Sequence, residues 1–220
     1  MLQQTQVSRV LEKFGPFIVR FPTIGALAAA TEDDVLAAWS GLGYYRRARL
    51  LHAAARGIVA DFEGTVPRDT PALMTIPGIG RYTAGAISSI VFGRNAPIVD
   101  GNVTRVLLRL DGVMARHGSK EAADYAWPRA ETLAGAAHGL GVIAAFNEGL
   151  MELGATVCTP RNPACGVCPL RAHCRARKWG TQEEIPLPKK APARLAVVHT
   201  ALLVKDEGER VLLELSLIHI

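Results

Sequence analysis

The sequence predicts an all-α protein with a metal-binding cysteine loop, followed by the start of a β-containing segment. Apolar residues recur at helical spacing through the first 155 residues, and no alternating run long enough for a sheet occurs before residue 190. All four cysteines fall within seventeen residues, at positions 158, 165, 168 and 174. With 220 residues and 49% hydrophobic content, the chain can form one or two domains.

Apolar faces and capping residues indicate the first helices. Residues 7–14 and 48–62 each carry an apolar stripe at helical spacing. Thr31 followed by Asp34 is typical of a capping box at the start of a short helix between these stripes. Glycines at positions 41 and 43 predict the end of that short helix.

The next helices are expected around a glycine-rich turn. Thr70 before Pro71 predicts an N-cap with proline at the first helical position. A turn over residues 77–80 leads into a helix that runs to Gly93, and residues 96–99 read as a buried extended segment.

Three further helices are expected after the extended segment. One opens near residue 103, and two more lie near residues 120–133 and 142–153. Gly154 is the expected C-terminal stop of the last helix.

The final part of the chain differs in character. Prolines and charged residues over positions 179–192 predict a polar linker. Residues 193–214 read as the first hairpin of a further β-containing domain. The last six residues, 215–220, do not continue this pattern and match a translated sequencing adapter, so we treat them as an artefact.

The cysteine spacing, C-x6-C-x2-C-x5-C, predicts one metal centre. Four thiolates can bind a zinc ion or a 4Fe–4S cluster. Zinc sites usually combine two C-x2-C pairs, and only Cys165 and Cys168 form such a pair, so the spacing favours the cluster. Disulfides are the least favoured alternative, because the polar start of the chain resembles no signal peptide and a reducing cytoplasm disfavours them.

Composition restricts the partners of the chain. The net charge of +5 and the sequence pI near 9.2 permit a nucleic-acid partner without requiring one. No apolar run approaches the ~20 residues that span a bilayer, so no membrane contact is expected. We also expect a cytoplasmic, nucleoid-associated protein of bacterial type that acts as a monomer.

Two motifs point to chemistry on DNA. The run Ile-Pro-Gly-Ile-Gly-Arg-Tyr over residues 76–82 reads as a helix–hairpin–helix, in which Gly78 and Gly80 bare backbone N–H groups for a phosphate. Asp100, in the run Val-Asp-Gly-Asn-Val, stands where an extended segment meets a helix start. A simple N-cap is one reading, and an ionised carboxylate that faces a substrate cation is the other.

These motifs, in this order and spacing before the cysteine loop, resemble the helix–hairpin–helix DNA glycosylases. The runs Met-Leu-Gln-Gln-Thr-Gln-Val (1–7) and Gly-Leu-Gly-Tyr-Tyr (41–45) are similar to those of adenine DNA glycosylases of the MutY type. The resemblance covers residues 1–190, with a Nudix-like domain beginning beyond. It implies a six-helix-barrel lobe over residues 1–100, lacking its N-terminal part, and an iron–sulfur cluster lobe over residues 101–178.

The resemblance also implies an activity, the removal of adenine paired with 8-oxoguanine or guanine after the base is flipped out of double-stranded DNA. Asp100 would stabilise the developing sugar cation, and Asn102 and Tyr82 would support the sugar and water. Gln4 and Tyr44 would enter the base stack.

Further contacts follow from the same resemblance. Thr5 would contact the opposite base, and Gly78 and Gly80 would bind phosphate. A 4Fe–4S cluster would be held by Cys158, Cys165, Cys168 and Cys174.

One departure from the family pattern concerns the general acid. The family has a glutamate two residues before the methionine that corresponds to Met1, so we expect a fragment, truncated at both ends, with little catalytic activity. An endonuclease III-like glycosylase-lyase for oxidised pyrimidines is the enzymatic alternative, although Tyr82 stands where that enzyme has its nucleophilic lysine. A non-catalytic DNA-binding fragment is a further alternative.

Overall fold

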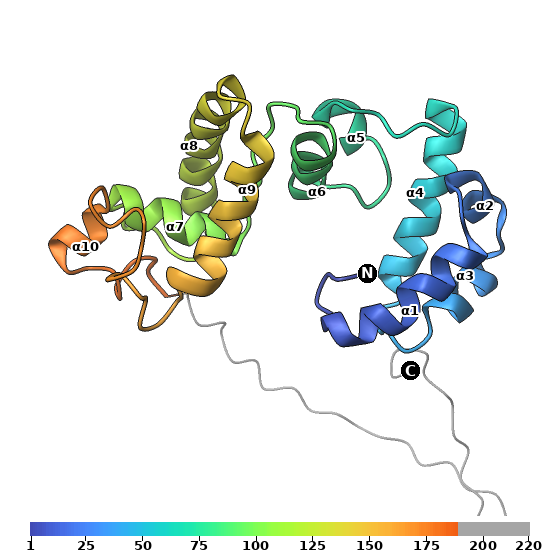
Figure 1. Ribbon diagram of the computed structural model, residues 1–220, viewed down its shortest axis with the longest axis horizontal. Helices are drawn as coiled ribbons and strands as arrows, with labels where there is room; N and C mark the ends of the chain where they lie inside the picture. Colours follow the sequence, from blue (N-terminus) through green and yellow to red (C-terminus); the bar gives the residue numbers. More distant parts are fainter. Residues whose placement is uncertain (189–220) are drawn as a thin grey trace, which may run out of the picture. The chain divides into compact units, whose positions relative to one another are not determined.

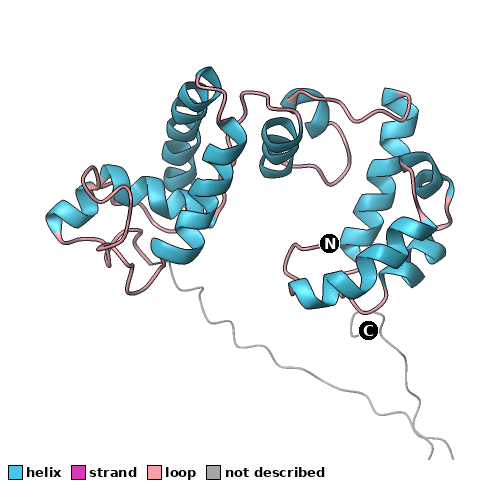
Figure 2. Ribbon diagram, in the orientation of Figure 1, coloured by secondary structure: helices cyan, strands magenta, loops and turns pink. Residues whose placement is uncertain are grey.

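A computed structural model describes residues 1–188, which fold into helices and connecting loops (Figures 1 and 2). No β-strand occurs within this range, and one isolated bridge pairs Arg116 with Leu187. The hairpin predicted for residues 193–214 and the tail at 215–220 lie outside the described residues. The elements in chain order are α1 (Val7–Arg20), α2 (Ile24–Ala29), α3 (Glu32–Trp39), α4 (Arg46–Phe62), α5 (Thr70–Met74), α6 (Arg81–Ala86), the π-helical turn η1 (Ile87–Val91), α7 (Gly101–Asp111), α8 (Lys120–Gly139), α9 (Ile143–Glu152), the π-helical turn η2 (Leu153–Val157) and α10 (Arg175–Trp179).

Helices α1 to α4 form an N-terminal helical group with its own core. Helices α2 and α3 pack against α4, and α1 packs against α3. Trp39 is 1% exposed and meets Phe17 edge to face, with ring centroids 6.1 Å apart. The predicted cap of α3 is confirmed, because the Thr31 hydroxyl accepts a hydrogen bond from the Asp34 backbone N–H at 3.2 Å.

Helices α7 to α10 form a C-terminal helical group. Helix α7 packs against α8 and α10, and α9 packs against α8 and η2. The buried face of α8 consists of alanines, whose small side chains allow neighbouring helices to approach closely. These residues are Ala122, Ala126, Ala130, Ala134 and Ala137. No helix within residues 1–188 has the length and apolar character that crossing a membrane requires.

The connection through α5, α6 and η1 differs in detail from the sequence-based prediction. Asp69, not Thr70, is the N-cap of α5, since its carboxylate accepts from the Ala72 N–H at 3.0 Å. Thr70 is therefore the first helical residue. The helix expected to reach Gly93 ends at Val91, and its last part is the π-helical turn η1. Helix α9 packs against η1 and so joins this connection to the C-terminal helical group.

Candidate active site and metal centre

Asp100 is the N-cap of α7, and its carboxylate is held on both oxygens. Oδ1 accepts a hydrogen bond from the Val103 backbone N–H at 2.7 Å, and Oδ2 accepts one from Asn102 Nδ2 at 3.1 Å. The Thr104 hydroxyl donates to the Asp100 carbonyl at 2.7 Å. The positive end of the helix dipole favours a negative charge at this position. The half-buried carboxylate is thus held in one orientation.

Tyr82, on α6, lies close enough to Asp100 for the two side chains to interact electrostatically. Burial, and then the negative charge of Asp100, raise the pKa of the Tyr82 phenol above its ordinary value. The Tyr82 hydroxyl also lies 3.5 Å from Met151 Sδ of α9. The structure therefore brings together three predicted site residues, Asp100, Asn102 and Tyr82, where α6, α7 and α9 meet.

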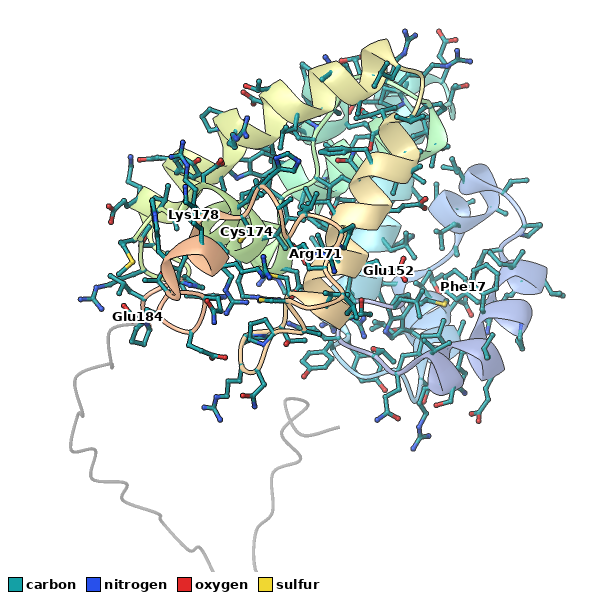
Figure 3. All side chains as sticks on the ribbon, turned by 60° about the vertical axis from the view of Figure 1, so that its left-hand side comes forward. Phe17, Glu152, Arg171, Cys174, Lys178 and Glu184 are labelled. Carbon is teal, nitrogen blue, oxygen red and sulfur yellow. The ribbon has the colours of Figure 1, made fainter. Side chains whose placement is uncertain are left out.

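Helix α9 contributes carboxylates that the sequence analysis did not single out. Glu148 and Glu152 are exposed and lie four residues apart, so they share one face of α9. Figure 3 labels Glu152 at the end of α9. Met151, three residues after Glu148, could have indicated them only once it was known to contact Tyr82.

Two buried arginines on α7 connect this site to the cysteine loop. Arg105 is 3% exposed and donates to Asn102 Oδ1 at 2.9 Å, to the Gly154 carbonyl at 2.7 Å and to the Cys158 carbonyl at 2.8 Å. Burial lowers the pKa of its guanidinium, and the charge of the nearby Cys158 opposes this effect. Arg109, one turn further along α7, is 2% exposed. Asp100 and Cys158 are thus joined through Asn102 and Arg105.

Gly154 is not the helix stop that the sequence predicted. It lies inside η2 and is buried, and a Cβ added there would lie 2.7 Å from the Asn102 Cβ. Only glycine allows the η2 backbone to approach α7 this closely, which is what places the Gly154 carbonyl against Arg105. The glycine is needed for packing beside the candidate site.

The four cysteines line one cavity together with Arg109, Arg171 and Arg177. All four are unpaired thiols, so the disulfide alternative has no support in the structure. Burial first, and then the neighbouring Cys158, Cys174 and Cys168, raise the pKa of Cys165. A bound metal cluster would offset this effect by holding the sulfurs as thiolates.

The four thiols share a cavity, as the ligands of a polynuclear cluster do. Within residues 1–188, no group of three or more His, Cys, Asp or Glu side chains is arranged to hold one metal ion. Arg109 donates to Cys158 Sγ at 3.4 Å, and Cys174 Sγ donates to the Arg109 carbonyl at 3.4 Å. In this arrangement a cluster would cross-link the loop and hold it against α7.

Basic side chains surround the cysteine loop. Figure 3 labels Arg171 and Lys178 on the same part of the chain as Cys174. Arg171 and Lys178 are exposed, and so are Arg161, Arg175 and Arg177. A solvent-exposed group of cations favours contact with a polyanion.

The hairpin glycines lie between α5 and α6, as expected. Gly78 has φ +80°, a left-handed conformation that favours glycine, and a Cβ there would lie 2.9 Å from the Leu50 Cβ. Gly80 is the N-cap of α6 in an extended conformation. The Ile79 N–H donates to the Ile76 carbonyl at 3.1 Å and closes the turn.

Thr5 and Tyr44 come together at Arg47, a residue to which the sequence analysis assigned no role, and Gln4 precedes Thr5 in the chain. Arg47 donates to Thr5 Oγ1 at 2.7 Å and to the Gln3 carbonyl, and its guanidinium lies 5.4 Å from the Tyr44 ring centroid. Gln4 and Tyr44 both have positive φ, 56° and 49°, and both are exposed. Such strained, exposed conformations are concentrated at binding sites.

Comparison with known proteins defines the class of this protein. Residues 1–131 match the HhH-GPD superfamily of base excision DNA repair proteins, and the chain belongs to this family. Residues 158–174 match the iron–sulfur binding domain of endonuclease III, so the cysteine loop is an iron–sulfur site, and the 4Fe–4S prediction is confirmed over zinc.

Particular relatives narrow the comparison to adenine DNA glycosylases. The chain is 44% identical to the Homo sapiens adenine DNA glycosylase over 186 residues, covering 84% of this chain and 33% of that protein. It is 46% identical to the Mycolicibacterium smegmatis adenine DNA glycosylase over 190 residues, covering 82% of this chain and 59% of that protein. The chain thus spans between one third and three fifths of the length of these relatives.

Solved structures show the same fold. A thermostable thymine-DNA glycosylase superposes with a TM-score of 0.65 at 27% identity, covering 81% of this chain and 80% of that one. A non-covalent endonuclease III–DNA complex superposes with a TM-score of 0.61 at 25% identity, with 81% and 80% covered. The helix–hairpin–helix glycosylase fold predicted from the sequence is confirmed.

Proposed function

We propose that this chain is the helical body of an adenine DNA glycosylase, which hydrolyses the N-glycosidic bond of adenine opposite 8-oxoguanine or guanine. The observation that carries the proposal is the meeting of Asp100, Asn102 and Tyr82 at one place. Identity of 40–46% to adenine DNA glycosylases over most of the chain supports it. The chain spans only part of the length of those relatives, so the activity, substrate and partners of the whole protein are proposed here together.

Asp100 acts electrostatically in this proposal. As the glycosidic bond loosens, the deoxyribose gains positive charge, and an ionised carboxylate nearby lowers the energy of that state. The hydrogen bonds from Val103 and Asn102 hold the carboxylate in one orientation before the reaction begins. Tyr82, whose raised pKa keeps its phenol protonated, donates a hydrogen bond to the sugar or to the attacking water.

The DNA contacts follow the same plan. The adenine leaves the stack and enters the site, while Gln4 and Tyr44, with their exposed left-handed backbones, fill the space beside the lesion. Thr5 faces the opposite base. Gly78 and Gly80 place the hairpin backbone next to a phosphate, a contact that positions the protein without reading sequence. The chain acts on the duplex as a monomer.

Hydrolysis also needs a proton for the departing adenine, which a carboxylic acid can supply. Glu148 and Glu152, exposed on α9 near Met151, are the carboxylates to examine for this step.

The test uses the purified chain with duplexes that contain adenine opposite 8-oxoguanine, and matched A·T duplexes. We expect tighter binding to the mispair, measured by fluorescence anisotropy at fixed salt. Asp100→Asn serves as the matched variant, because it keeps the size of the side chain and removes its charge. Equal binding to mispair and A·T duplexes would refute the proposed function.

The lyase alternative is distinguished by covalent trapping. The endonuclease III complexes that share this fold favour it, whereas Tyr82 at the position of the nucleophilic lysine opposes it. A lyase forms a Schiff base with its substrate, and borohydride reduces this to a stable protein–DNA adduct. We expect no adduct from this chain on a duplex with an oxidised pyrimidine.

A further inference from the structure

The extended segment just before Asp100 is buried without lying in a sheet. Ala96, Ile98 and Val99 are 3%, 1% and 8% exposed, and residues 96–99 belong to no helix or strand. Buried backbone N–H and C=O groups need partners, and in most proteins a neighbouring strand supplies them. Here another group must supply them, and that group determines where the chain enters α7.

Asn147 of α9 supplies both partners with its side-chain amide. It is 1% exposed, and its Nδ2 donates to the Ala96 carbonyl at 2.9 Å, while its Oδ1 accepts from the Ile98 N–H at 3.3 Å. The carbonyl of one residue and the N–H two residues later are the groups that a parallel neighbouring strand binds. The Asn147 carboxamide therefore takes the place of the N–H and C=O that one residue of a neighbouring strand would supply.

A second set of contacts holds the same segment from the side of α6 and η1. Asn147 Nδ2 also donates to Ser89 Oγ at 2.9 Å, and the Ser89 hydroxyl donates to the Gly85 carbonyl at 2.7 Å. A Cβ on Gly85 would lie 2.2 Å from the Pro97 carbonyl oxygen, so α6 touches the segment directly. Residues 96–98 are thus held between α6 and η1 on one side and α9 on the other.

We propose that Asn147 is a positioning residue for Asp100. The Asn147 amide binds Ile98, two residues before Asp100. Through Ser89 and the Gly85 carbonyl, it also connects this segment to α6, the helix that carries Tyr82. The carboxylate and the phenol thereby keep a fixed separation while DNA enters the site. This inference rests on the proposed function, because it assigns Asp100 the task of stabilising a sugar cation.

The experiment measures that task by binding, without requiring base release. Two duplexes are compared, each with an abasic analogue opposite 8-oxoguanine. One analogue is a cationic pyrrolidine nucleotide, and the other is the neutral tetrahydrofuran nucleotide. The wild-type chain is expected to prefer the cation, because Asp100 interacts with its charge. The ratio of the two dissociation constants reports the placement of Asp100, whereas a general loss of structure weakens both complexes.

We expect Asn147→Ala to lower this ratio by about tenfold or more, since small displacements of a preorganised charged group have large effects. Its affinity for the neutral analogue should stay close to that of the wild type. Ser89→Ala, which removes one of the three partners, should lower the ratio by less, and it serves as the test if Asn147→Ala does not fold. Ile143→Ala, on the same helix but away from residues 96–99, is the control for lost stability.

Three results would overturn the inference. An unchanged ratio in both Asn147→Ala and Ser89→Ala would show that the amide does not place Asp100. An equal loss of affinity for the two analogues, reproduced by Ile143→Ala, would show a purely structural role. Absence of any preference in the wild-type chain would refute the proposed function itself, and the inference with it.

Discussion

Replacement of Arg109 by methionine tests whether the buried cation holds the cysteine loop in place. Arg109 donates to the carbonyls of Thr159, Pro160 and Ile185 at 2.6, 3.1 and 2.7 Å. Among the described residues no ion pair joins it to a carboxylate. Methionine keeps the aliphatic volume but leaves these carbonyls without their donors.

The expected loss can be worked from these contacts. The bond to the Ile185 carbonyl is buried, and this acceptor left without a partner costs about 1–3 kcal/mol. The bonds to Thr159 and Pro160 are part-buried, so water can reach these carbonyls and their loss adds about 1 kcal/mol together. The net loss of about 2–4 kcal/mol lowers the melting temperature of a domain of this size by roughly 4–16 °C.

The assay is thermal unfolding followed by circular dichroism, together with iron content and the visible absorption of the cluster. Arg177→Met is the matched control, because Arg177 lines the same cavity but is exposed, and within residues 1–188 its one hydrogen bond goes to the Arg171 carbonyl, at 3.4 Å. That control should shift stability by less than about 0.5 kcal/mol. An Arg109→Met protein with the same melting temperature as the Arg177→Met control and with its full iron content would refute the reasoning.

Three further predictions concern the site, the hairpin and a half-buried phenol. Asp100→Asn should abolish the preference for the cationic abasic analogue while binding of the neutral one persists, and fluorescence anisotropy would expose a retained preference. Gly78→Ala should lower the free energy of unfolding by about 1–3 kcal/mol and weaken duplex binding, because residue 78 has a positive φ and an added Cβ would meet Leu50. Denaturant unfolding measures the loss, and Gly80→Ala is the control, because a Cβ added at Gly80 meets no atom within 4 Å. Burial, followed by the hydrogen bond to a neighbouring carboxylate, raises the pKa of Tyr125 from 10.0 to about 12. As the pH rises, the phenol loses its proton at a lower pH in the unfolded chain than in the folded chain. The contribution of Tyr125 to stability is therefore present below pH 10 and is lost as the pH rises to about 12. Tyr125→Phe should flatten that decline in a pH series, and an unchanged slope would contradict the assignment.

Local signals in the sequence were sufficient for the features that depend on near neighbours. The cap at Thr31 needs only the residues that follow it, and the same holds for Asp100 at the start of α7. The cysteine spacing likewise predicted a shared metal centre, because the ligands lie close together in the chain. The turn at Gly78 is short enough to be predicted from its glycines.

Local sequence patterns did not predict the features that depend on contacts between residues far apart in the chain. Gly154 was expected to end a helix, but its small size is required by the approach of Asn102, which lies more than fifty residues earlier in the chain. Arg47 and Asn147 were assigned no role in the site, since nothing adjacent in sequence distinguishes an arginine or asparagine that binds remote carbonyls. Asp69 was passed over as a cap because Thr70 and Pro71 offered an equally good local pattern.

The long reach of Arg109 also has a consequence during synthesis of the chain. Its partner Ile185 lies 76 residues further along. At roughly 5–20 residues per second, about 4–15 s separate the translation of these two residues. During that interval α7 has emerged with an arginine that still lacks its final acceptor. The C-terminal helical group therefore completes its packing only after residue 185 has left the ribosome, so a nascent chain stalled before that point should expose α7 to proteases and chaperones.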